Sequence, residues 1–239
     1  MPSFDPAAVR AITFDLYGTL LDLEATFAPA FGVFLESREA SVDAAELVRT
    51  WEWAYLHEGM VDTFLGGPRT PFEQLRRTTL SQVFARLDIE HSREDIEDLL
   101  AVRATPTLFP DVAETLAALR SRYTLAVLSN GDLAALERIV STLSIPVHRT
   151  ISVELAGCYK PDLRVYRRAA GLLELEPGGI LHVAAHAWDI RAAQAAGMNG
   201  AYVDRHNIPF APYTAYRPEI ETTDLPELAA ILSPALPTP

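Results

Sequence analysis

A chain of 239 residues with 49% hydrophobic residues is long enough to bury a substantial apolar core, yet it contains no apolar run long enough to cross a bilayer. Its formal net charge of −12 argues against nucleic acid or an anionic membrane surface as a partner, because both are bound through basic patches. A lone cysteine, Cys158, and the lack of a basic-then-apolar leader lead us to expect a protein of the reducing cytoplasm.

Short apolar runs alternate with amphipathic stretches along most of the chain. The first run, at residues 9–15, ends at an acidic residue just before a glycine, which is typical of a buried strand entering a tight loop. Further strands are predicted at 124–128, 150–153, 180–183 and 200–203, and helices at 112–120, 133–143, 163–173 and 190–196. This alternation predicts an α/β fold with a doubly wound, Rossmann-like parallel sheet covered on both faces.

The pattern changes between residues 24 and 104. Amphipathic helices are predicted there at 44–57, 72–87 and 93–102, without a convincing strand. We therefore predict a helical domain of residues 21–104, inserted after the first strand, and a core domain made of residues 1–20 and 105–239. Two prolines at 106 and 110 break the helical pattern before the core resumes. The chain past residue 207 is rich in proline, with one short helix expected at 225–232.

Of the 20 basic residues, only Lys160 is a lysine. A compositional bias toward arginine that spared one lysine would explain this. A site that needs a compact ammonium rather than a planar guanidinium would explain it equally well.

Polar side chains follow the predicted strands at the points where the strands end. Because ligands of a doubly wound sheet bind outside the carboxyl ends of its strands, we expect these side chains to gather at one edge. Together they offer a nucleophile, hydroxyl donors, a counter-charge and a second acid that can position water. They are Asp15 with Thr19, Ser129 with Asn130, Lys160 with Tyr166, and His186 with Trp188 and Asp189.

Each of these residues also has a structural alternative. An aspartate after a strand is more often a turn or helix-cap residue than a nucleophile, and Ser129 and Asn130 can form a turn that caps the next helix. The occurrence of several such motifs in one order favours chemistry. The six histidines have no metal-ligand spacing, and we predict no metal site.

The segments FDLYGTLLD, LSNGD, YKPDLRVY and AHAWD, in that order, resemble the haloacid dehalogenase superfamily and most closely its L-2-haloacid dehalogenases. The resemblance runs from Ile12 to about Arg205. It implies that residues 21–104 form a cap, and that the protein hydrolyses short 2-haloalkanoic acids, such as haloacetates and 2-halopropionates, without a cofactor. The implied partners are a small anionic halogenated carboxylate and water, and the aromatic-rich cap offers a surface for a homodimer.

The alternative function depends on Tyr17. Phosphatases of this superfamily carry a second aspartate at that position, which protonates the leaving alcohol near a magnesium ion. A halide needs no proton, so Tyr17 favours the dehalogenase. A magnesium-dependent phosphatase of small phosphorylated metabolites, or a member of the fold without catalytic activity, remains the alternative.

The resemblance also implies roles for single residues. Asp15 displaces the halide and forms an ester, and Lys160 supplies the positive charge that keeps Asp15 ionised. Thr19, Ser129, Asn130 and Tyr166 hold the carboxylates or the ester oxygen, and Asp189 orients Lys160 and the hydrolytic water. The residues implied in substrate and halide binding are Arg49, which precedes Tyr55 by six positions, and Tyr17, Phe72, His186 and Trp188.

The last motif departs from the family pattern. Ala184 and His186 stand where the better-known dehalogenases carry serine and asparagine. Loss of the serine removes a hydrogen bond near Lys160 and Asp189, so the water step is expected to be organised differently. We also hypothesise that His186, being larger than asparagine, narrows the halide pocket and favours chloride or fluoride over bromide and iodide.

Overall fold

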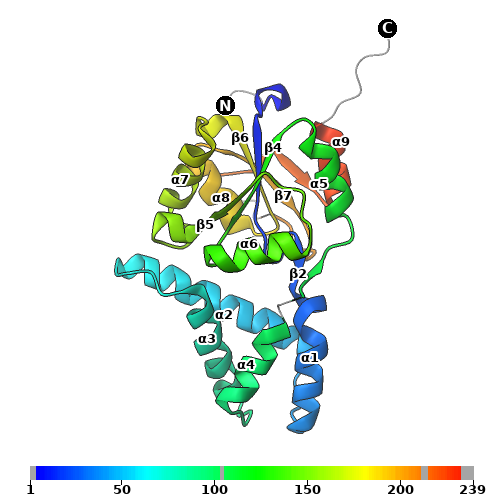
Figure 1. Cartoon of the computed structure of the whole chain (residues 1–239), viewed down its shortest axis with the longest axis vertical. Coiled ribbons are helices and arrows are strands. Elements are labelled where there is room, and N and C mark those ends of the chain that lie inside the picture. Colours follow the sequence, from blue (N-terminus) through cyan, green and yellow to red (C-terminus); the bar gives the residue numbers. More distant parts are fainter. Residues whose placement is uncertain (1–3, 103–104, 211–214, 233–239) are drawn as a thin grey trace.

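A computed structural model describes residues 4–102, 105–210 and 215–232 of the chain. Its centre is a six-stranded sheet in the order β5-β4-β1-β6-β7-β8, in which every neighbouring pair is parallel (Figure 1). The strands are β1 (Ala11–Phe14), β4 (Thr124–Ser129), β5 (Arg149–Ser152), β6 (Ile180–Ala184), β7 (Asn199–Val203) and β8 (Ile220–Thr222). The predicted doubly wound parallel sheet is therefore confirmed.

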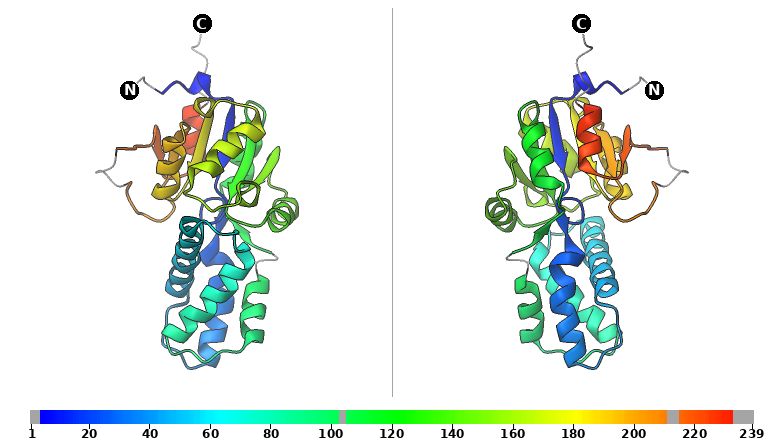
Figure 2. Two further views of the ribbon diagram at one scale, coloured as in Figure 1. Left: turned by 90° about the vertical axis from the view of Figure 1, so that its left-hand side faces the viewer. Right: turned by 90° about the vertical axis from the view of Figure 1, so that its right-hand side faces the viewer.

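Helices cover both faces of this sheet. Helices α5 (Val112–Arg120) and α9 (Leu225–Leu232) pack together on one face, and α7 (Leu163–Leu173) and α8 (Ala187–Ala195) pack together on the other (Figure 2). Helix α6 (Leu133–Thr142) packs against the edge strand β5. All four residues of the central strand β1 are buried, as expected for a parallel strand covered on both sides.

Helices α1 (Leu23–Ser37), α2 (Ala44–Leu65), α3 (Phe72–Arg86) and α4 (Arg93–Ala101) form a group of their own beside the carboxyl ends of the strands (Figure 1). We call α1–α4 the helical group. Its interior is aromatic: the rings of Phe27, Phe31 and Trp51 lie 5.2–5.8 Å apart, and Phe31 also contacts Phe84. The predicted boundaries between the helical domain and the core stay a prediction, and residue 104 lies outside the described part of the chain.

Two short strands join the helical group to the sheet. Strand β2 (Leu21–Asp22) pairs in antiparallel fashion with β3 (Thr107–Leu108), so the chain leaves for the helical group and returns from it at one place. The first helix begins directly after β2, where the side chain of Asp22 accepts a hydrogen bond from the Ala25 amide. No helix among the described residues is long and apolar enough to cross a membrane.

Several observed elements differ from the predicted ones. Helix α1 was not predicted, and α8 begins three residues before the predicted start at residue 190. Helix α2 continues eight residues beyond the predicted end at residue 57 and stops at Gly66, whose φ of 73° gives the left-handed conformation typical of a helix end. The strands β2, β3 and β8 were not predicted, because runs of two or three residues carry no readable alternation.

A first prediction concerns the packing of α8 on β7. A Cβ atom added at Gly200 would lie 2.6 Å from Cγ2 of Ile190. We therefore expect Gly200→Ala to lower the free energy of unfolding by about 1–3 kcal/mol through overpacking. Gly171→Ala is the control: this helical glycine has open space around it, and the substitution should stabilise the chain by up to about 1 kcal/mol. Denaturant unfolding followed by circular dichroism measures both, and equal stabilities would contradict the packing argument.

Candidate active site

The nucleophile candidate Asp15 directly follows the central strand. Its amide donates to the carbonyl oxygen of Val183 at 2.9 Å, which extends the pairing of β1 with β6 by one residue. The chain then turns at Gly18, which has a φ of 79°. A Cβ atom there would lie 2.9 Å from Cε1 of His186, so the loop needs glycine for its conformation and for the space it leaves.

Lys160 connects the two acids of the predicted site. Its Nζ lies 3.1 Å from Oδ1 of Asp15 and 2.7 Å from Oδ2 of Asp189, and all three residues are buried. The backbone amide of Lys160 donates to Oδ1 of Asn130 at 3.0 Å, which holds the loop before α7 against the end of β4. The only lysine of the chain thus bridges two buried carboxylates.

The remaining oxygen atoms of the two carboxylates also have partners. The hydroxyl of Thr19 donates to Oδ2 of Asp15 at 3.0 Å and accepts from the Ala185 amide at 2.9 Å. The hydroxyl of Tyr166 donates to Oδ1 of Asp189, and Nε2 of His182 lies 3.1 Å from the same oxygen. His182 was not predicted as a site residue, because a histidine inside an apolar strand is indistinguishable in the sequence from a core residue.

The charges of this cluster support one another. Burial by itself raises the pKa of Asp15, but Lys160 and then His186 lower it, and the net pKa lies below its ordinary value. Burial likewise opposes ionisation of Asp189, yet Lys160 and His182 hold its pKa well below the usual range. Burial also disfavours the ammonium of Lys160, whose pKa is nevertheless raised by Asp15 and Asp189. Two carboxylates and one ammonium are therefore charged at neutral pH.

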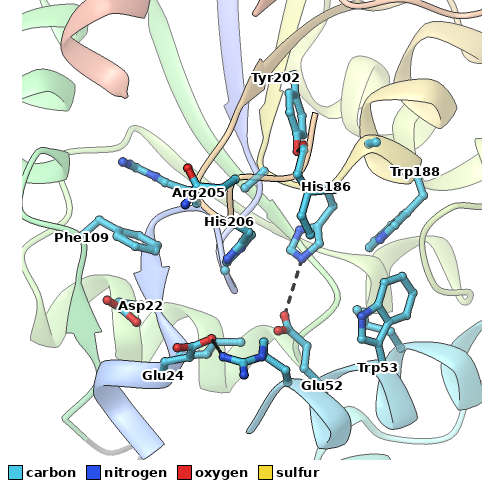
Figure 3. A pocket seen from close by; sticks show the side chains of 18 residues that line it. Asp22, Glu24, Glu52, Trp53, Phe109, His186, Trp188, Tyr202, Arg205 and His206 are labelled. Carbon is cyan, nitrogen blue, oxygen red and sulfur yellow. Dashed lines mark hydrogen bonds and ion pairs between the residues drawn. The ribbon is translucent and has the colours of Figure 1, made fainter. Parts of the chain in front are cut away.

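A second charged pair joins the sheet to the helical group. His186, in the loop between β6 and α8, places Nδ1 3.6 Å from Oδ2 of Asp15 and Nε2 3.6 Å from Oε1 of Glu52 in α2 (Figure 3). Burial lowers the pKa of His186, but the two carboxylates outweigh burial and raise the pKa to about 10. Glu52 was missed by sequence reasoning, because a glutamate on an amphipathic helix reads as a surface residue.

Two cavities meet at this pair. The inner cavity, of about 10 Å³, is lined by Asp15, Tyr17, Glu52, Tyr55, Leu56, Phe72, Asn130, His186 and Trp188. The outer cavity has a volume of about 620 Å³ (Figure 3) and shares Glu52, Leu56, His186 and Trp188 with the inner cavity. A space of 10 Å³ holds about one water molecule. These four side chains form a partition between the outer cavity and Asp15.

The structure brings most of the predicted substrate-binding residues to the inner cavity. Tyr17, Phe72, His186 and Trp188 line it, and the rings of Tyr17 and Phe72 lie 5.5 Å apart. Arg49 is not among them. It lines the outer cavity, where its Nη1 pairs with Oε1 of Glu24 at 2.6 Å and its side chain is 52% exposed.

Ser129, at the end of β4, is fully buried beneath the site, and its hydroxyl has no hydrogen-bond partner among the described residues. Of the predicted site residues it is therefore the one whose contacts give no support to its implied role.

A buried arginine stands behind the aromatic wall of the inner cavity. The guanidinium carbon of Arg76 lies 4.8–5.9 Å from the ring centroids of Tyr17, Phe27, Trp51, Tyr55 and Phe72, and the residue is 2% exposed. Its nearest carboxylate oxygen, Oε1 of Glu73, is 3.9 Å away. No sequence motif distinguishes it from the neighbouring Arg77, which pairs with Glu97.

Comparisons with known proteins agree with this geometry. The family model of haloacid dehalogenase-like hydrolases matches residues 9–197. The chain belongs to this family. (S)-2-haloacid dehalogenase 1 of Pseudomonas sp. (strain CBS-3) is 31% identical, over 85% of this chain and 90% of that protein. (S)-2-haloacid dehalogenase 4A of Burkholderia cepacia is 29% identical, over 86% and 89%.

Solved structures of the family superpose on nearly the whole chain. A crystal structure of a defluorinating L-2-haloacid dehalogenase has a TM-score of 0.81 and 29% identity, and covers 94% of this chain and 95% of its own. A dehalogenase crystallised as an intermediate complex has a TM-score of 0.82 and 28% identity, and covers 94% and 97%. The haloacid dehalogenase fold predicted from the motifs is thereby confirmed.

A second prediction concerns Lys160. In Lys160→Met, two buried carboxylates lose the cation between them, and we expect both inactivity and a loss of about 3–5 kcal/mol in the free energy of unfolding near neutral pH. The control Arg77→Met removes a half-exposed ion pair and should cost at most about 1 kcal/mol.

The dependence of stability on pH should become steeper between about pH 8 and pH 5 in the same variant, while the raised pKa of His186 acts equally in both proteins. In the native chain the lowered pKa values of Asp15 and Asp189 contribute stability above their ordinary value of 3.8, and this stability is lost as the pH falls through the lowered values. In Lys160→Met, burial raises both pKa values, so the chain gains stability as the pH falls from about 8 to about 5. Urea unfolding across this range tests the change, and parallel curves for the two proteins would contradict it.

Proposed function

We propose that this member of the haloacid dehalogenase-like hydrolases cleaves the carbon–halogen bond of short 2-haloalkanoic acids, through an ester on Asp15. The observation that carries the proposal is the ring of Tyr17 beside Asp15 in the inner cavity, where a phosphatase needs a carboxyl group. The two relatives named above agree with the proposal, since both are (S)-2-haloacid dehalogenases. The reaction is RX + H₂O → ROH + X⁻ + H⁺.

The first step is a displacement at carbon. A carboxylate oxygen of Asp15 attacks C2 of the haloacid, an ester bond forms and the halide leaves with the bonding electron pair. Asp15 has to be ionised for this step, and the charge of Lys160 keeps its pKa low. The hydroxyl of Thr19 holds Oδ2 of Asp15 and thereby fixes the orientation of the carboxylate.

The second step is hydrolysis of the ester. Water attacks Cγ of Asp15 and the bond from Cγ to the oxygen that joins C2 breaks. That oxygen leaves as the hydroxyl of a 2-hydroxy acid, and the oxygen of water replaces it in the Asp15 carboxylate. In this proposal Asp189 and Tyr166 keep Lys160 in place and Asn130 fixes the loop that carries it, because each is hydrogen-bonded in that chain of contacts. Ser129, whose buried hydroxyl has no hydrogen-bond partner among the described residues, is proposed to serve the ester oxygen.

Substrate recognition is proposed to combine an aromatic wall with cations. Tyr17, Phe72 and Trp188 enclose the substrate carbon, and protonated His186 attracts the departing halide. Arg49 is proposed to receive the substrate carboxylate in the outer cavity, exchanging Glu24 for it.

We further infer that residues 21–104 act as a cap over a core of residues 1–20 and 105–239. The helical group supplies four of the nine residues that line the inner cavity and the core supplies the other five, so displacement of the helical group opens the partition at Glu52 and His186. The lone, buried Cys158 suits the reducing cytoplasm as the site of action. A homodimer is proposed through the helical group, where Phe64 and Leu65 are 90% and 76% exposed.

The magnesium-dependent phosphatase fits the residues less well. Magnesium prefers a near-octahedral shell of oxygen ligands, and among the described residues no three His, Cys, Asp or Glu side chains gather in such an arrangement. Asp15 and Asp189 are both engaged by Lys160, and Tyr17 brings a ring in place of a carboxylate.

A third prediction tests the reaction itself. The purified protein should release halide from chloroacetate, bromoacetate and one enantiomer of 2-chloropropionate, and EDTA should leave the rate unchanged. Asp15→Asn should be inactive, because an amide neither displaces halide nor carries the charge that Lys160 supports. Ion chromatography measures the halide. Turnover of p-nitrophenyl phosphate that EDTA abolishes, without halide release, would overturn the proposal.

A fourth prediction tests the halogen preference. His186 lines the inner cavity beside Asp15, and replacing it with the smaller asparagine should enlarge the space available to the leaving group. We expect His186→Asn to raise kcat/KM for bromoacetate relative to fluoroacetate and chloroacetate. Trp53→Asn is the control and should leave the preference unchanged. Trp53 is 61% exposed, and it lines the outer cavity but not the inner one. An unchanged preference in His186→Asn would refute the role assigned to His186.

A further inference from the structure

The imidazole of His186 lies between two carboxylates that serve different parts of the molecule. Its Nε2 faces Glu52 of the helical group at 3.6 Å, and its Nδ1 faces Oδ2 of Asp15 at 3.6 Å. The Nδ1 atom is buried and has no hydrogen-bond partner among the described residues. One nitrogen thus faces a carboxylate that can orient the ring, and the other faces the reaction centre.

This is the arrangement in which a histidine works as a general base. A carboxylate on one ring nitrogen fixes the tautomer and stabilises the imidazolium, while the other nitrogen exchanges a proton with the reacting group. The side chains of His186 and Glu52 are 13% exposed, so their interaction is little screened by water. Ala184, which stands where the better-known dehalogenases carry serine, has no side-chain group that could hydrogen-bond to a water molecule.

We propose that His186 is the general base of ester hydrolysis and that Glu52 is its positioning residue. The inference rests on the proposed ester at Asp15 and assigns the second step of that reaction to the pair. The pairing also explains why a largely buried glutamate lies in a site that binds an anion. While His186 is protonated, its charge balances that of Glu52, and the partition therefore adds no net charge to the path of the substrate.

The proton balance follows from the loss of charge at Asp15. In the resting site His186 is protonated and faces two carboxylates. Once Asp15 is an ester, one of these negative charges is gone, and the imidazolium becomes more acidic. It then releases its proton to water in the outer cavity as the halide departs, and neutral imidazole is left facing the ester through Nδ1.

Neutral His186 next takes a proton from water at Nδ1 as the oxygen of that water bonds to Cγ of Asp15. When the tetrahedral intermediate collapses, the bond from Cγ to the oxygen that joins C2 breaks, and the leaving alkoxide takes the proton from the imidazolium. Asp15 is left as a carboxylic acid, which returns its proton to His186. The site is then restored, and the cycle has released one halide ion and one proton for each substrate.

The charged and titratable groups that face His186 come from several elements. They are Asp15 after β1, Glu52 in α2, and His206 in the loop after β7, whose ring lies 6.1 Å from that of His186. Of these, Glu52 is the group whose charge persists when the ester forms. Replacing Glu52 with a neutral residue therefore lowers the pKa of His186 in the protein whose Asp15 is esterified. Loss of a merely structural contact would leave that pKa unchanged.

The experiment measures which step the pair serves. Wild type, Glu52→Gln and His186→Gln are mixed with excess chloroacetate, quenched at increasing times, and analysed by intact-protein mass spectrometry and by halide release. We expect one burst of halide in both variants, slower in His186→Gln because the cation that attracts the halide is lost, and then still slower turnover. The ester should accumulate, as a chain whose mass is increased by that of the substrate minus its halide. Ester hydrolysis should slow by roughly 10²-fold or more in His186→Gln.

A matched control exists on the same helix. Glu58 lies 3.7 Å from Nδ1 of His57, but that pair is exposed to solvent, so Glu58→Gln removes the same kind of contact without touching the site. It should react as wild type does. The rate of ester hydrolysis in Glu52→Gln should also reach its plateau at lower pH than in wild type, because neutral His186 is the active form and its pKa is lowered.

A slowed halide burst without ester accumulation would overturn the inference, because it would assign the pair to the first step. Equal rates of ester hydrolysis in Glu52→Gln and Glu58→Gln would also overturn it. So would a pH profile of ester hydrolysis in Glu52→Gln that is the same as in wild type. Failure of the proposed function is distinguishable, because then wild type itself releases no halide and no chain gains mass. Circular dichroism melting of each variant checks that it is folded.

Discussion

The ammonium of Lys160 between two buried carboxylates is the interaction on which the site depends. Burying charge is costly unless each charge is paired and hydrogen-bonded, and here the loop after β1, the segment before α7 and the start of α8 each contribute one member. None of these segments can shift without leaving a charge unpaired. The contacts of Lys160 with Asp15 and Asp189 therefore determine both the charges of the site and the positions of three separate segments.

The fold could be read from the sequence because its strands are short apolar runs that end at polar residues. Helices α5, α7 and α9 begin and end where the apolar spacing placed them. What the pattern lacked was information on elements made by long-range pairing. Strand β8 exists because Ile220 pairs with Ala201 of β7, and β2 exists because Leu21 pairs with Leu108 across the helical group.

The core half of the site was predictable for the same reason: strand ends of a parallel sheet share one edge, so Asp15, Lys160 and Asp189 had to meet. The half contributed by the helical group was not. Which face of α2 meets the sheet depends on tertiary packing, and it turns Glu52 inward while Arg49 reaches the outer cavity. Arg76 was not predicted because its five aromatic contacts come from four separate segments, namely the loop after β1 and helices α1, α2 and α3.

The lone lysine also determines how the protein responds to chemical modification. Apart from the chain's amino terminus, amine-directed reagents find no primary amine on the surface, because every other basic side chain is a guanidinium and Lys160 is 1% exposed. Acylation or reductive methylation of Lys160 therefore requires the partition above Asp15 to open. The rate of that modification therefore reports how often the site opens, because no other side chain carries a primary amine that would react.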